Sequence, residues 1–482
     1  MHFRVILRIM GILLMIFSIT SLPPLLIDLW YQEGTAQVFI DSYLALLGVG
    51  LFLWLPLRNE KKDLRLRDGF LVVVLFWFVL GVSGALPLLL YKPLNISVVD
   101  AVFESISGLT TTGATVLTGL DALPHSILFY RQMLQWLGGM GIIVLAVAIL
   151  PMLGVGGMQL YKAETPGPVK DNKLTPRIAD TAKLLWFVYL ALTTACAVSF
   201  WFAGMSFFDA VCHSFSTLAT GGFSTHDESL GYFDSPLIEA VAVVFMIAGG
   251  VNFSLHFMVF RQWSLKYYFM DAEFRTYLAV LVSVSLVCVV YLYFSHVDSL
   301  SDALRHGIFH TVSIMTTTGY TTSAFYLWPG FLPVLLLFTS FVGGSAGSTA
   351  GGMKVIRVLL LMKQGMREMM RLIHPNAQVV VKVGKMPVSD RVIDSVWGFF
   401  ASYVAVFVLM MLLLMASGLD QVTAFSAVAT TINNTGPGLG DVAVNFAGIN
   451  DFSKWVLSVA MIMGRLEIFT LLVLFTPAFW RK

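Results

Sequence analysis

The sequence predicts an all-α polytopic membrane protein with about ten spans and four re-entrant segments in pseudo-fourfold symmetry. Three observations support this prediction. Of the 482 residues, 57% are hydrophobic and only 12% are charged, and a soluble domain would have about twice that charged fraction. Apolar runs of about 20 residues, the length of a spanning helix, recur along the chain. Between them recurs a short polar segment that ends in glycine, which indicates an internal repeat.

The apolar runs place the helices in chain order. The first two form an N-terminal transmembrane hairpin, and the other eight form four pairs. The chain starts with basic residues, as a signal peptide does, but its first apolar stretch is too long and no A-x-A-like cleavage site follows, so we expect it to be retained. The expected spans are 5–30, 36–57, 69–91, 130–153, 182–204, 236–258, 276–295, 331–362, 393–417 and 453–479.

Basic residues orient these helices. They concentrate at both ends of the chain and in alternate connections, near residues 58–67, 162–183, 261–275 and 363–391. The remaining connections contain few of them, among which are Lys92, Arg131, Arg305 and Lys454. We therefore expect both termini on the cytoplasmic side.

Four segments of the external connections align on one glycine. They read DAVFESISGLTTTGATV, DAVCHSFSTLATGGFST, HGIFHTVSIMTTTGYTT and AFSAVATTINNTGPGLG. Upstream of each glycine lies an acid where a helix should start, at Asp100, Asp209, Asp302 and Asp420. The repeat divides the chain into an N-terminal transmembrane hairpin (1–67), repeat 1 (68–165), repeat 2 (166–270), repeat 3 with an intramembrane loop (271–365), a cytoplasmic connection (366–392) and repeat 4 (393–482).

Each repeat reads spanning helix, short half-helix, polar tetrapeptide, spanning helix. A half-helix is too short to cross the bilayer, and irregular backbone at membrane depth is tolerated only when it is buried or lines a cavity. Four such segments around one axis would form a polar constriction that offers backbone carbonyls to a dehydrated cation. A single copy would be an ordinary Thr/Gly turn, but four aligned copies disfavour that alternative. The predicted filter residues are Thr110, Thr111, Thr112, Gly113; Ala219, Thr220, Gly221, Gly222; Thr316, Thr317, Thr318, Gly319; and Asn433, Asn434, Thr435, Gly436.

Two further positions of the repeat keep open roles. A hydroxyl six residues before each glycine, at Ser107, Ser216, Ser313 and Thr430, would bond either the filter backbone or its own helix carbonyl. Nine residues before the glycine stand Glu104, His213, His310 and Ala427. The three polar ones would either brace the filter from behind or simply be packed or solvated.

The eighth span contains the stretch FVGGSAGSTAGGMKVIR. A helix this rich in glycine is weak, so we expect a loop that faces the internal cavity and acts as a gate; the alternative is a close-packed helix interface of small residues. The expected gate residues are Gly343, Gly344, Ser345, Ala346, Gly347, Ser348, Thr349, Ala350, Gly351 and Gly352, together with Arg465. Arg465 and Glu467 lie inside the tenth span, where a charge is a functional candidate by default, and their spacing points them to different faces.

Two other classes of function share some of these sequence features. GGSAG matches the G-x-S-x-G pattern of serine hydrolases, with Ser345 as nucleophile, but the α/β sheet that this motif needs is not predicted. A Na⁺/K⁺ or proton-coupled cation carrier is the nearer alternative, although carriers usually show twofold inverted repeats rather than four parallel ones. The net charge of only +2 argues against nucleic-acid binding.

The chain resembles a known family at these motifs. The four filter segments and the stretches GGSAGSTAGGMKVIR, MGRLEIFT, FYRQMLQWLGGMGIIVLAVAILP and YKAETPGPVKDNKLTPRIADTAK are similar to the TrkH/TrkG membrane subunits of bacterial Trk potassium-uptake systems, within the Trk, Ktr and HKT superfamily. The resemblance implies four M1-P-M2 repeats that are potassium-channel-like, in the bacterial inner membrane. K⁺ would be the transported ion bound at the filter, with no other cofactor and no enzymatic activity.

The resemblance also implies partners. It implies a homodimer with one pore in each protomer, and a cytoplasmic TrkA-like ring that binds ATP/ADP or NAD(H) and regulates transport. In the superfamily a serine at the first filter glycine accompanies sodium permeation, so Gly113 favours potassium. Four residues depart from the family pattern, namely Thr318, Tyr320, Ala350 and Thr435. The sequence is compatible both with pure conduction and with symport with protons or sodium.

Overall fold

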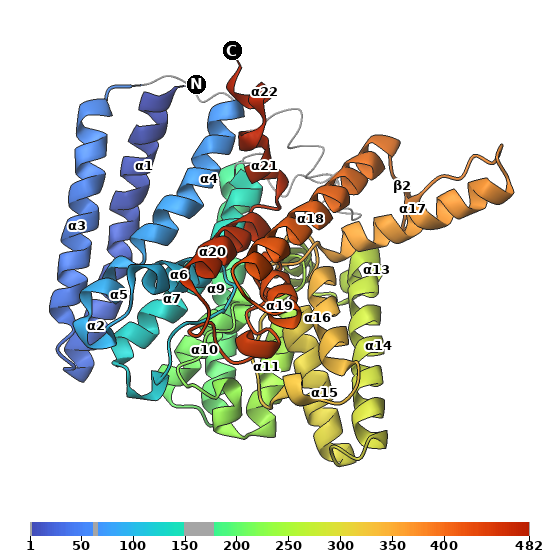
Figure 1. Cartoon of the computed structure of the whole chain (residues 1–482), viewed down its shortest axis with the longest axis horizontal. Helices are drawn as coiled ribbons and strands as arrows, with labels where there is room; N and C mark the ends of the chain where they lie inside the picture. The colour runs from blue at the N-terminus through green and yellow to red at the C-terminus, as the bar shows by residue number, and fades with distance from the viewer. Residues whose placement is uncertain (1, 61–65, 149–177, 482) are drawn as a thin grey trace.

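The computed structural model describes residues 2–60, 66–148 and 178–481, and almost all regular structure there is helical (Figure 1). The N-terminal hairpin consists of α1 (Phe3–Ser18), η1 (Ile19–Ser21), α2 (Leu22–Tyr31), α3 (Ala36–Trp54) and η2 (Leu55–Leu57). Its two long helices cross closely, because a Cβ on Gly11 would lie 2.8 Å from the Gly50 carbonyl oxygen. This contact between small residues is a common way for helices to pack in membranes.

The first two repeat units follow the hairpin. Unit 1 contains α4 (Leu66–Ser83), α5 (Leu86–Leu90), η3 (Lys92–Leu94), α6 (Val98–Leu109), η4 (Leu120–Ala122) and α7 (His125–Ala148). Unit 2 contains α9 (Ile178–Phe202), α10 (Phe207–Ala219), η6 (Ser229–Phe233), α11 (Pro236–Gly249), α12 (Phe253–Gln262) and α13 (Lys266–Met270). The end of the predicted span 130–153 and much of the basic connection 162–183 lie outside the described residues.

Units 3 and 4 repeat the pattern. Unit 3 contains α14 (Ala272–Phe294), α15 (Leu300–Met315), η7 (Phe325–Leu327), α16 (Leu332–Val342) and α17 (Val355–Ile373). A short antiparallel hairpin of β1 (Lys382–Val383) and β2 (Met386–Pro387) pairs Val383 with Met386. Unit 4 contains α18 (Asp390–Ala416), α19 (Gln421–Ile432), η8 (Gly440–Val442), α20 (Asp451–Arg465), α21 (Phe469–Phe475) and α22 (Pro477–Trp480).

The predicted polytopic all-α architecture is confirmed, but two of the predicted spans are bent rather than straight. Among the described residues, six helices are long and apolar enough to cross a membrane, or up to eight if bent pairs count as single spans. The bent pairs are α11 with α12, at 101°, and α20 with α21, at 116°. The predictions of continuous helices over 236–258 and 453–479 were therefore wrong. The runs 130–153 and 331–362 correspond to α7 and to α16 and α17, which a non-helical segment separates.

Each bend has a local cause. After α11, Asn252 starts a new helix, because its side chain accepts a hydrogen bond from the Ser254 amide. After α20, Glu467 and Ile468 adopt left-handed backbone angles, with φ of 56° and 53°, and an α-helix cannot continue through such residues. The second helices of units 2, 3 and 4 are thus all broken.

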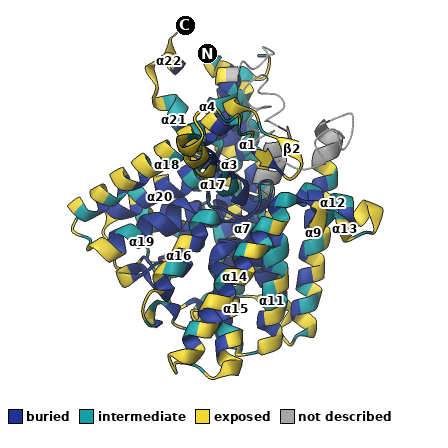
Figure 2. Ribbon diagram, turned by 90° about the vertical axis from the view of Figure 1, so that its right-hand side faces the viewer, coloured by how far each residue is buried: buried dark blue, intermediate teal, exposed yellow. Residues whose placement is uncertain are grey.

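Burial follows what a membrane protein with a polar interior requires. Buried residues concentrate along the centre of the molecule, and exposed residues line the outer helix faces (Figure 2). Large apolar side chains are exposed on these outer faces, for example Leu286 on α14 and Leu412 on α18. By contrast, the residues of the four tetrapeptides are buried, apart from the partly buried glycines Gly113, Gly222 and Gly319. The polar interior is the part of the fold that the sequence repeat marks.

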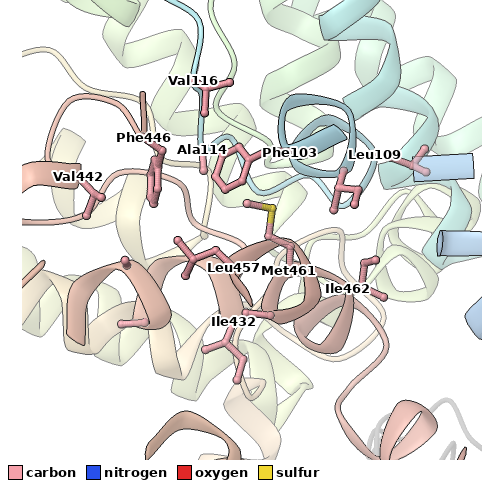
Figure 3. Close-up of a cluster of buried hydrophobic side chains, with 14 of the residues drawn as sticks. Phe103, Leu109, Ala114, Val116, Ile432, Val442, Phe446, Leu457, Met461 and Ile462 are labelled. Atoms are coloured by element: carbon pink, nitrogen blue, oxygen red, sulfur yellow. The ribbon is translucent and has the colours of Figure 1, made fainter. Parts of the chain in front are cut away.

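A hydrophobic cluster joins unit 4 to unit 1, far apart in sequence (Figure 3). Phe103 on α6 packs against Phe446, with ring centroids 5.5 Å apart, and Met461 of α20 lies in the same cluster. The Phe446 amide donates to the carbonyl of Thr115 at 2.8 Å, and the Lys454 ammonium pairs with Asp100 at 2.6 Å. These contacts close the four units into a ring.

Candidate functional site

All four half-helices end in the same backbone turn. Numbered back from each aligned glycine, the residue at minus two has a left-handed φ of 51–57°, and these residues are Thr111, Thr220, Thr317 and Asn434. The amide of the residue at minus one donates to the carbonyl at minus six over 2.7–2.8 Å, and the amide at minus two donates to the carbonyl at minus five over 3.0–3.1 Å. This pair of bonds is the Schellman motif. It turns each chain sharply at the negative end of its helix dipole.

The four aligned glycines form a closed circle of contacts. Each has a φ between 80° and 93°, which favours glycine. A Cβ on any of them would approach the carbonyl oxygen of the residue that precedes the next unit's glycine. From the Cβ position to the carbonyl oxygen, the distances are 2.1 Å from Gly113 to Gly221, 2.0 Å from Gly222 to Thr318, 2.0 Å from Gly319 to Thr435 and 2.8 Å from Gly436 to Thr112.

A cavity of about 490 Å³ opens next to this ring, and all four glycines contribute to its lining. Asp227, Glu228, His226 and Arg131 also line it. A polar cavity that leads to four converging backbone turns is suited to bring a hydrated ion to a narrow passage.

The half-helices are capped more elaborately than the sequence indicated. In units 1 to 3 the N-cap is a serine, Ser97, Ser206 or Ser299, and the predicted acid stands three residues later, where its carboxylate accepts the serine hydroxyl. Only in unit 4 is the acid itself the cap, since Asp420 accepts from the amides of Val422 and Thr423. The first three have the spacing of a capping box with aspartate in place of the usual glutamate, but the carboxylate accepts from the serine hydroxyl.

The residues at minus six accept a backbone hydrogen bond in every unit, but their hydroxyls differ in their partners. Ser216 donates to the Gln135 side chain at 2.7 Å, and Ser313 donates to the carbonyl of Tyr320, next to the third glycine. Thr430 instead bonds Ser426 in its own helix at 3.0 Å. The Ser107 hydroxyl has no hydrogen-bond partner within the described part of the chain.

The polar residues at minus nine contact the segment that follows the aligned glycine of their own unit. Glu104 accepts from the Val116 amide at 2.9 Å and from Arg131 at 2.7 Å. His213 contacts the Ser224 hydroxyl at 3.0 Å, and His310 contacts Ser323 at 3.1 Å. All three side chains are fully buried. This geometry matches the bracing arrangement rather than solvation.

The glycine-rich stretch of the eighth span forms a loop between α16 and α17, not a close-packed helix. Gly343, Gly347 and Gly352 have φ of 68–74°, which only glycine adopts easily. The loop lies against the half-helix ends of three units. The Thr349 hydroxyl donates to the Leu218 carbonyl at 2.9 Å, the Gly351 amide to the Thr317 hydroxyl at 2.6 Å, and the Gly352 amide to the Asn433 carbonyl at 3.1 Å.

Arg465 bridges this loop and unit 1. Its guanidinium donates to the carbonyls of Thr349 and Gly138, both at 2.9 Å, and the side chain is buried. Arg465 forms no ion pair with any residue in the ranges that the structure describes. The alternative that Arg465 is half of a structural ion pair is therefore not supported there. Glu467 pairs with Arg357 instead, at 2.5 Å. The two charges do point apart, as their spacing predicted.

The arrangement around Ser345 does not resemble a hydrolase. Its hydroxyl is buried and lacks a hydrogen-bond partner among the described residues, whereas an activated serine needs an adjacent base. The motif lies between two helices, not on a strand-to-helix turn. His306 and His310 contact Asp298 and Ser323 instead.

Two residues of the site were missed from the sequence. Arg131, counted above as part of an external connection, is 1% exposed and pairs with Glu104. Gln135 donates to the Gly221 carbonyl at 2.7 Å and accepts from the Phe223 amide at 3.1 Å. Both follow the start of an apolar run in the stretch RQMLQ, and polar residues inside a span are a signal that could have found them.

The comparisons with known proteins fit this geometry. The family model TrkH, described as a cation transport protein, matches residues 35–482. The chain belongs to the TrkH family. It is 59% identical to the Trk system potassium uptake protein TrkH of Vibrio parahaemolyticus and 55% identical to that of Escherichia coli, each over the full length of both chains. It is 42% identical to TrkG of Escherichia coli, over 100% of this chain and 99% of TrkG.

A solved structure of the TrkH family matches the whole fold. The crystal structure of the potassium transporter TrkH from Vibrio parahaemolyticus superposes with a TM-score of 0.93 at 57% identity, and the match covers 100% of both chains. The apolar helices and the family together indicate an integral membrane protein of the bacterial inner membrane.

Proposed function

We propose that this chain takes up potassium as the membrane subunit of a Trk system, through a filter made of the four tetrapeptides. The closed circle of four glycines, each against a neighbouring carbonyl, is the observation that supports this proposal most directly. Four equivalent Schellman turns direct four helix C-termini toward one place, which favours a cation there. Backbone carbonyls then replace the water around a potassium ion. The names of the relatives, which are potassium uptake proteins, agree with potassium as the ion.

The proposal assigns gating to residues 343–352 and Arg465. The loop contacts the half-helix ends of units 2, 3 and 4, and Arg465 links it to unit 1. An ion that leaves the filter would therefore meet this loop. Because α17 follows the loop directly and projects from the body of the molecule (Figure 1), movement of α17 can be transmitted to the loop.

Regulation and assembly complete the proposal. A TrkA-like cytoplasmic ring that binds ATP/ADP or NAD(H) would act on the basic connection that includes α17, and two copies of the chain would form a homodimer with one pore each. Both termini would lie in the cytoplasm. The repeat boundaries given above serve as the proposed functional units.

Growth and flux measurements test the proposal. The chain is expressed in cells that lack potassium uptake, with and without a TrkA-like partner, and growth at low potassium and rubidium uptake are measured. We expect rescue that depends on the partner. Absence of rescue with correctly inserted protein would contradict potassium uptake, whereas uptake that stops when the proton or sodium gradient is collapsed at constant membrane potential would favour a coupled carrier.

A further inference from the structure

A buried carboxylate outside the filter contacts the glycine-rich loop. Glu273 lies in the first turn of α14, and 3% of it is exposed. Its Oε1 accepts a hydrogen bond from the amide of Ala346, in the middle of the loop, at 2.7 Å. A buried amide that loses its hydrogen-bond partner costs free energy, so this bond favours the observed position of the loop. The loop's backbone is thus tied at Ala346 to the first helix of unit 3.

The same carboxylate interacts with the helix that follows the loop. The first amides of an α-helix have no partner within the helix, and Lys354, the N-cap of α17, provides no side-chain cap. The backbone amide of Ile356, in the first turn of α17, lies beside the carboxyl group of Glu273. Glu273 is thus placed to contact both the loop and the start of the helix that follows it.

These two contacts hold both ends of a short segment. Between Ala346 and Ile356 lie Thr349, Gly351 and Gly352, the residues that contact the half-helix ends. If Glu273 releases the segment, the loop loses its tie to α14 and keeps its contacts with the half-helix ends, with Arg465 and with the backbone of Gly250 and Phe253.

We propose that Glu273 is a positioning residue of the gate, which holds the loop beneath the filter and sets its equilibrium with a displaced position. The inference rests on the proposed role of the loop as the gate. Movement of α17 away from α14 separates the Ile356 amide from Glu273 and weakens its hold on Ala346. Glu273 therefore links the position of α17 to that of the loop.

The test uses a reporter in the loop and the full chain in liposomes with its TrkA-like partner. Ser345→Cys introduces a thiol where the hydroxyl makes no hydrogen bond in the described part of the chain, and the native Cys196, Cys212 and Cys288 are buried. The rate of modification by a water-soluble thiol reagent reports displacement of the loop, and rubidium flux reports conduction. The chain without the reporter gives the background.

In Glu273→Ala we expect a modification rate and a partner-independent flux each raised by about 10-fold, the size expected when a buried amide loses its hydrogen-bond partner. Glu273→Gln keeps an acceptor for Ala346 and should stay nearer to the wild type than Glu273→Ala does. Ser283→Ala is the control on the same helix: its exposed hydroxyl donates to the Ala279 carbonyl within α14 at 2.7 Å, and its loss should leave both rates unchanged.

The outcomes separate the two proposals. An unchanged modification rate in Glu273→Ala overturns the inference. A raised modification rate with unchanged flux supports the role of Glu273 and contradicts the loop as a gate. If Glu273→Ala does not fold, Glu273→Asp takes its place, because the shorter side chain keeps the carboxyl group but withdraws it from Ala346; a wild-type modification rate in that variant also overturns the inference.

Discussion

At the scale of single residues, the ring glycines are required for two separate reasons. A left-handed φ disfavours any side chain, and a Cβ would collide with a carbonyl of the next unit. A second glycine of the same loop separates these reasons. Gly119 has a φ of 72°, but a Cβ there would meet nothing within 4 Å. Gly113 and Gly119 therefore share a left-handed backbone conformation and differ in the room available for a side chain.

Gly113→Ser is expected to lower the preference for potassium over sodium. The new side chain would push the Gly221 carbonyl, 2.1 Å from the Cβ position, out of the ring. The bi-ionic reversal potential of the purified protein in bilayers measures the preference. Gly119→Ser is the control and should keep the wild-type potential; an unchanged potential in Gly113→Ser would mean that Gly113 does not line the filter.

Arg465→Ala is expected to raise the maximal rubidium flux without changing the order of ion preference. A cation about 6 Å from the guanidinium would meet a repulsion of about 3 kcal/mol at an effective dielectric constant of about 20. That repulsion slows passage by on the order of 100-fold if nothing offsets it. Arg465→Lys keeps the charge and should stay near wild type. Loss of flux in folded Arg465→Ala would instead assign Arg465 a structural role.

His226, which lines the cavity beside the ring, makes a pH-dependent contact. Its ring contacts Asp121 at 2.5 Å and Asp209 at 3.5 Å. Burial alone would lower the pKa of His226, but the neighbouring carboxylates of Asp209 and Asp121 outweigh burial and raise it. A raised pKa means that the charged histidine stabilises the folded protein fully below its ordinary value of about 6.5, and that this contribution is lost as the pH rises through the raised pKa.

We therefore expect the melting temperature of the wild type to fall over this pH range by more than that of His226→Gln. Thermal unfolding in detergent between mildly acidic and alkaline pH measures the difference. The effect should be modest, because Asp121 is half exposed and solvent screens the pair. Parallel curves for the two proteins would show that the pair contributes nothing to stability.

At the scale of elements, each Schellman turn has threonine or asparagine at its left-handed position, where glycine would adopt the backbone angles at lower cost. The left-handed residues use their side chains. The Thr317 hydroxyl holds the loop through Gly351, and the Asn434 amide donates to the Thr112 hydroxyl of unit 1 at 2.9 Å. Glycine would relieve the backbone but would lose these contacts.

Removal of residues 346–350 from the loop is expected to raise flux and to weaken its dependence on the partner. The deletion takes away Thr349, which contacts both Leu218 and Arg465. Rubidium flux with and without the partner measures both effects, and the ion preference serves as an internal control because the filter is intact. Flux that stays low and fully partner-dependent in a folded protein would argue against the gate.

The elements also show where sequence reasoning succeeded and where it could not. Four half-helices and the loop of unit 3 were predicted, because low helix propensity and polar residues coincide there. The break in unit 2 had a signal that was not used, the run Gly249, Gly250 and then the capping Asn252. The break in unit 4 had almost none, since Glu467 and Ile468 are not residues that favour left-handed backbone.

At the scale of the whole molecule, the ring closes between units 4 and 1, which are not consecutive in the chain. The contact between Gly436 and Thr112 is the loosest of the four, at 2.8 Å against 2.0–2.1 Å. The interface of units 4 and 1 must be held by packing, as the cluster around Phe103 and Phe446 shows (Figure 3). The fourfold repeat predicted a ring, but which residues close it depends on contacts between distant segments, and no local pattern encodes them.

Phe446→Ala is expected to destabilise the protein by about 3–5 kcal/mol, the usual cost of removing a buried aromatic ring. It should also lower the potassium preference, because Gly436 is then held less firmly against Thr112. Thermal unfolding and the reversal potential measure the two effects. Phe452→Ala is the control, since Phe452 is 52% exposed, and equal effects in both variants would refute the role of the cluster.

The closure between units 4 and 1 sets an order on biosynthesis. A ring of separate subunits can assemble from finished copies, whereas here the first quarter of the ring leaves the ribosome long before the last. Until Gly436 meets Thr112 and Arg465 reaches Gly138, the nascent protein has no complete circle of carbonyls and nothing that joins the loop to unit 1. If the four tetrapeptides form the filter as proposed, a product that terminates before Gly436 lacks one quarter of it, and ion selection can arise only when translation is nearly complete.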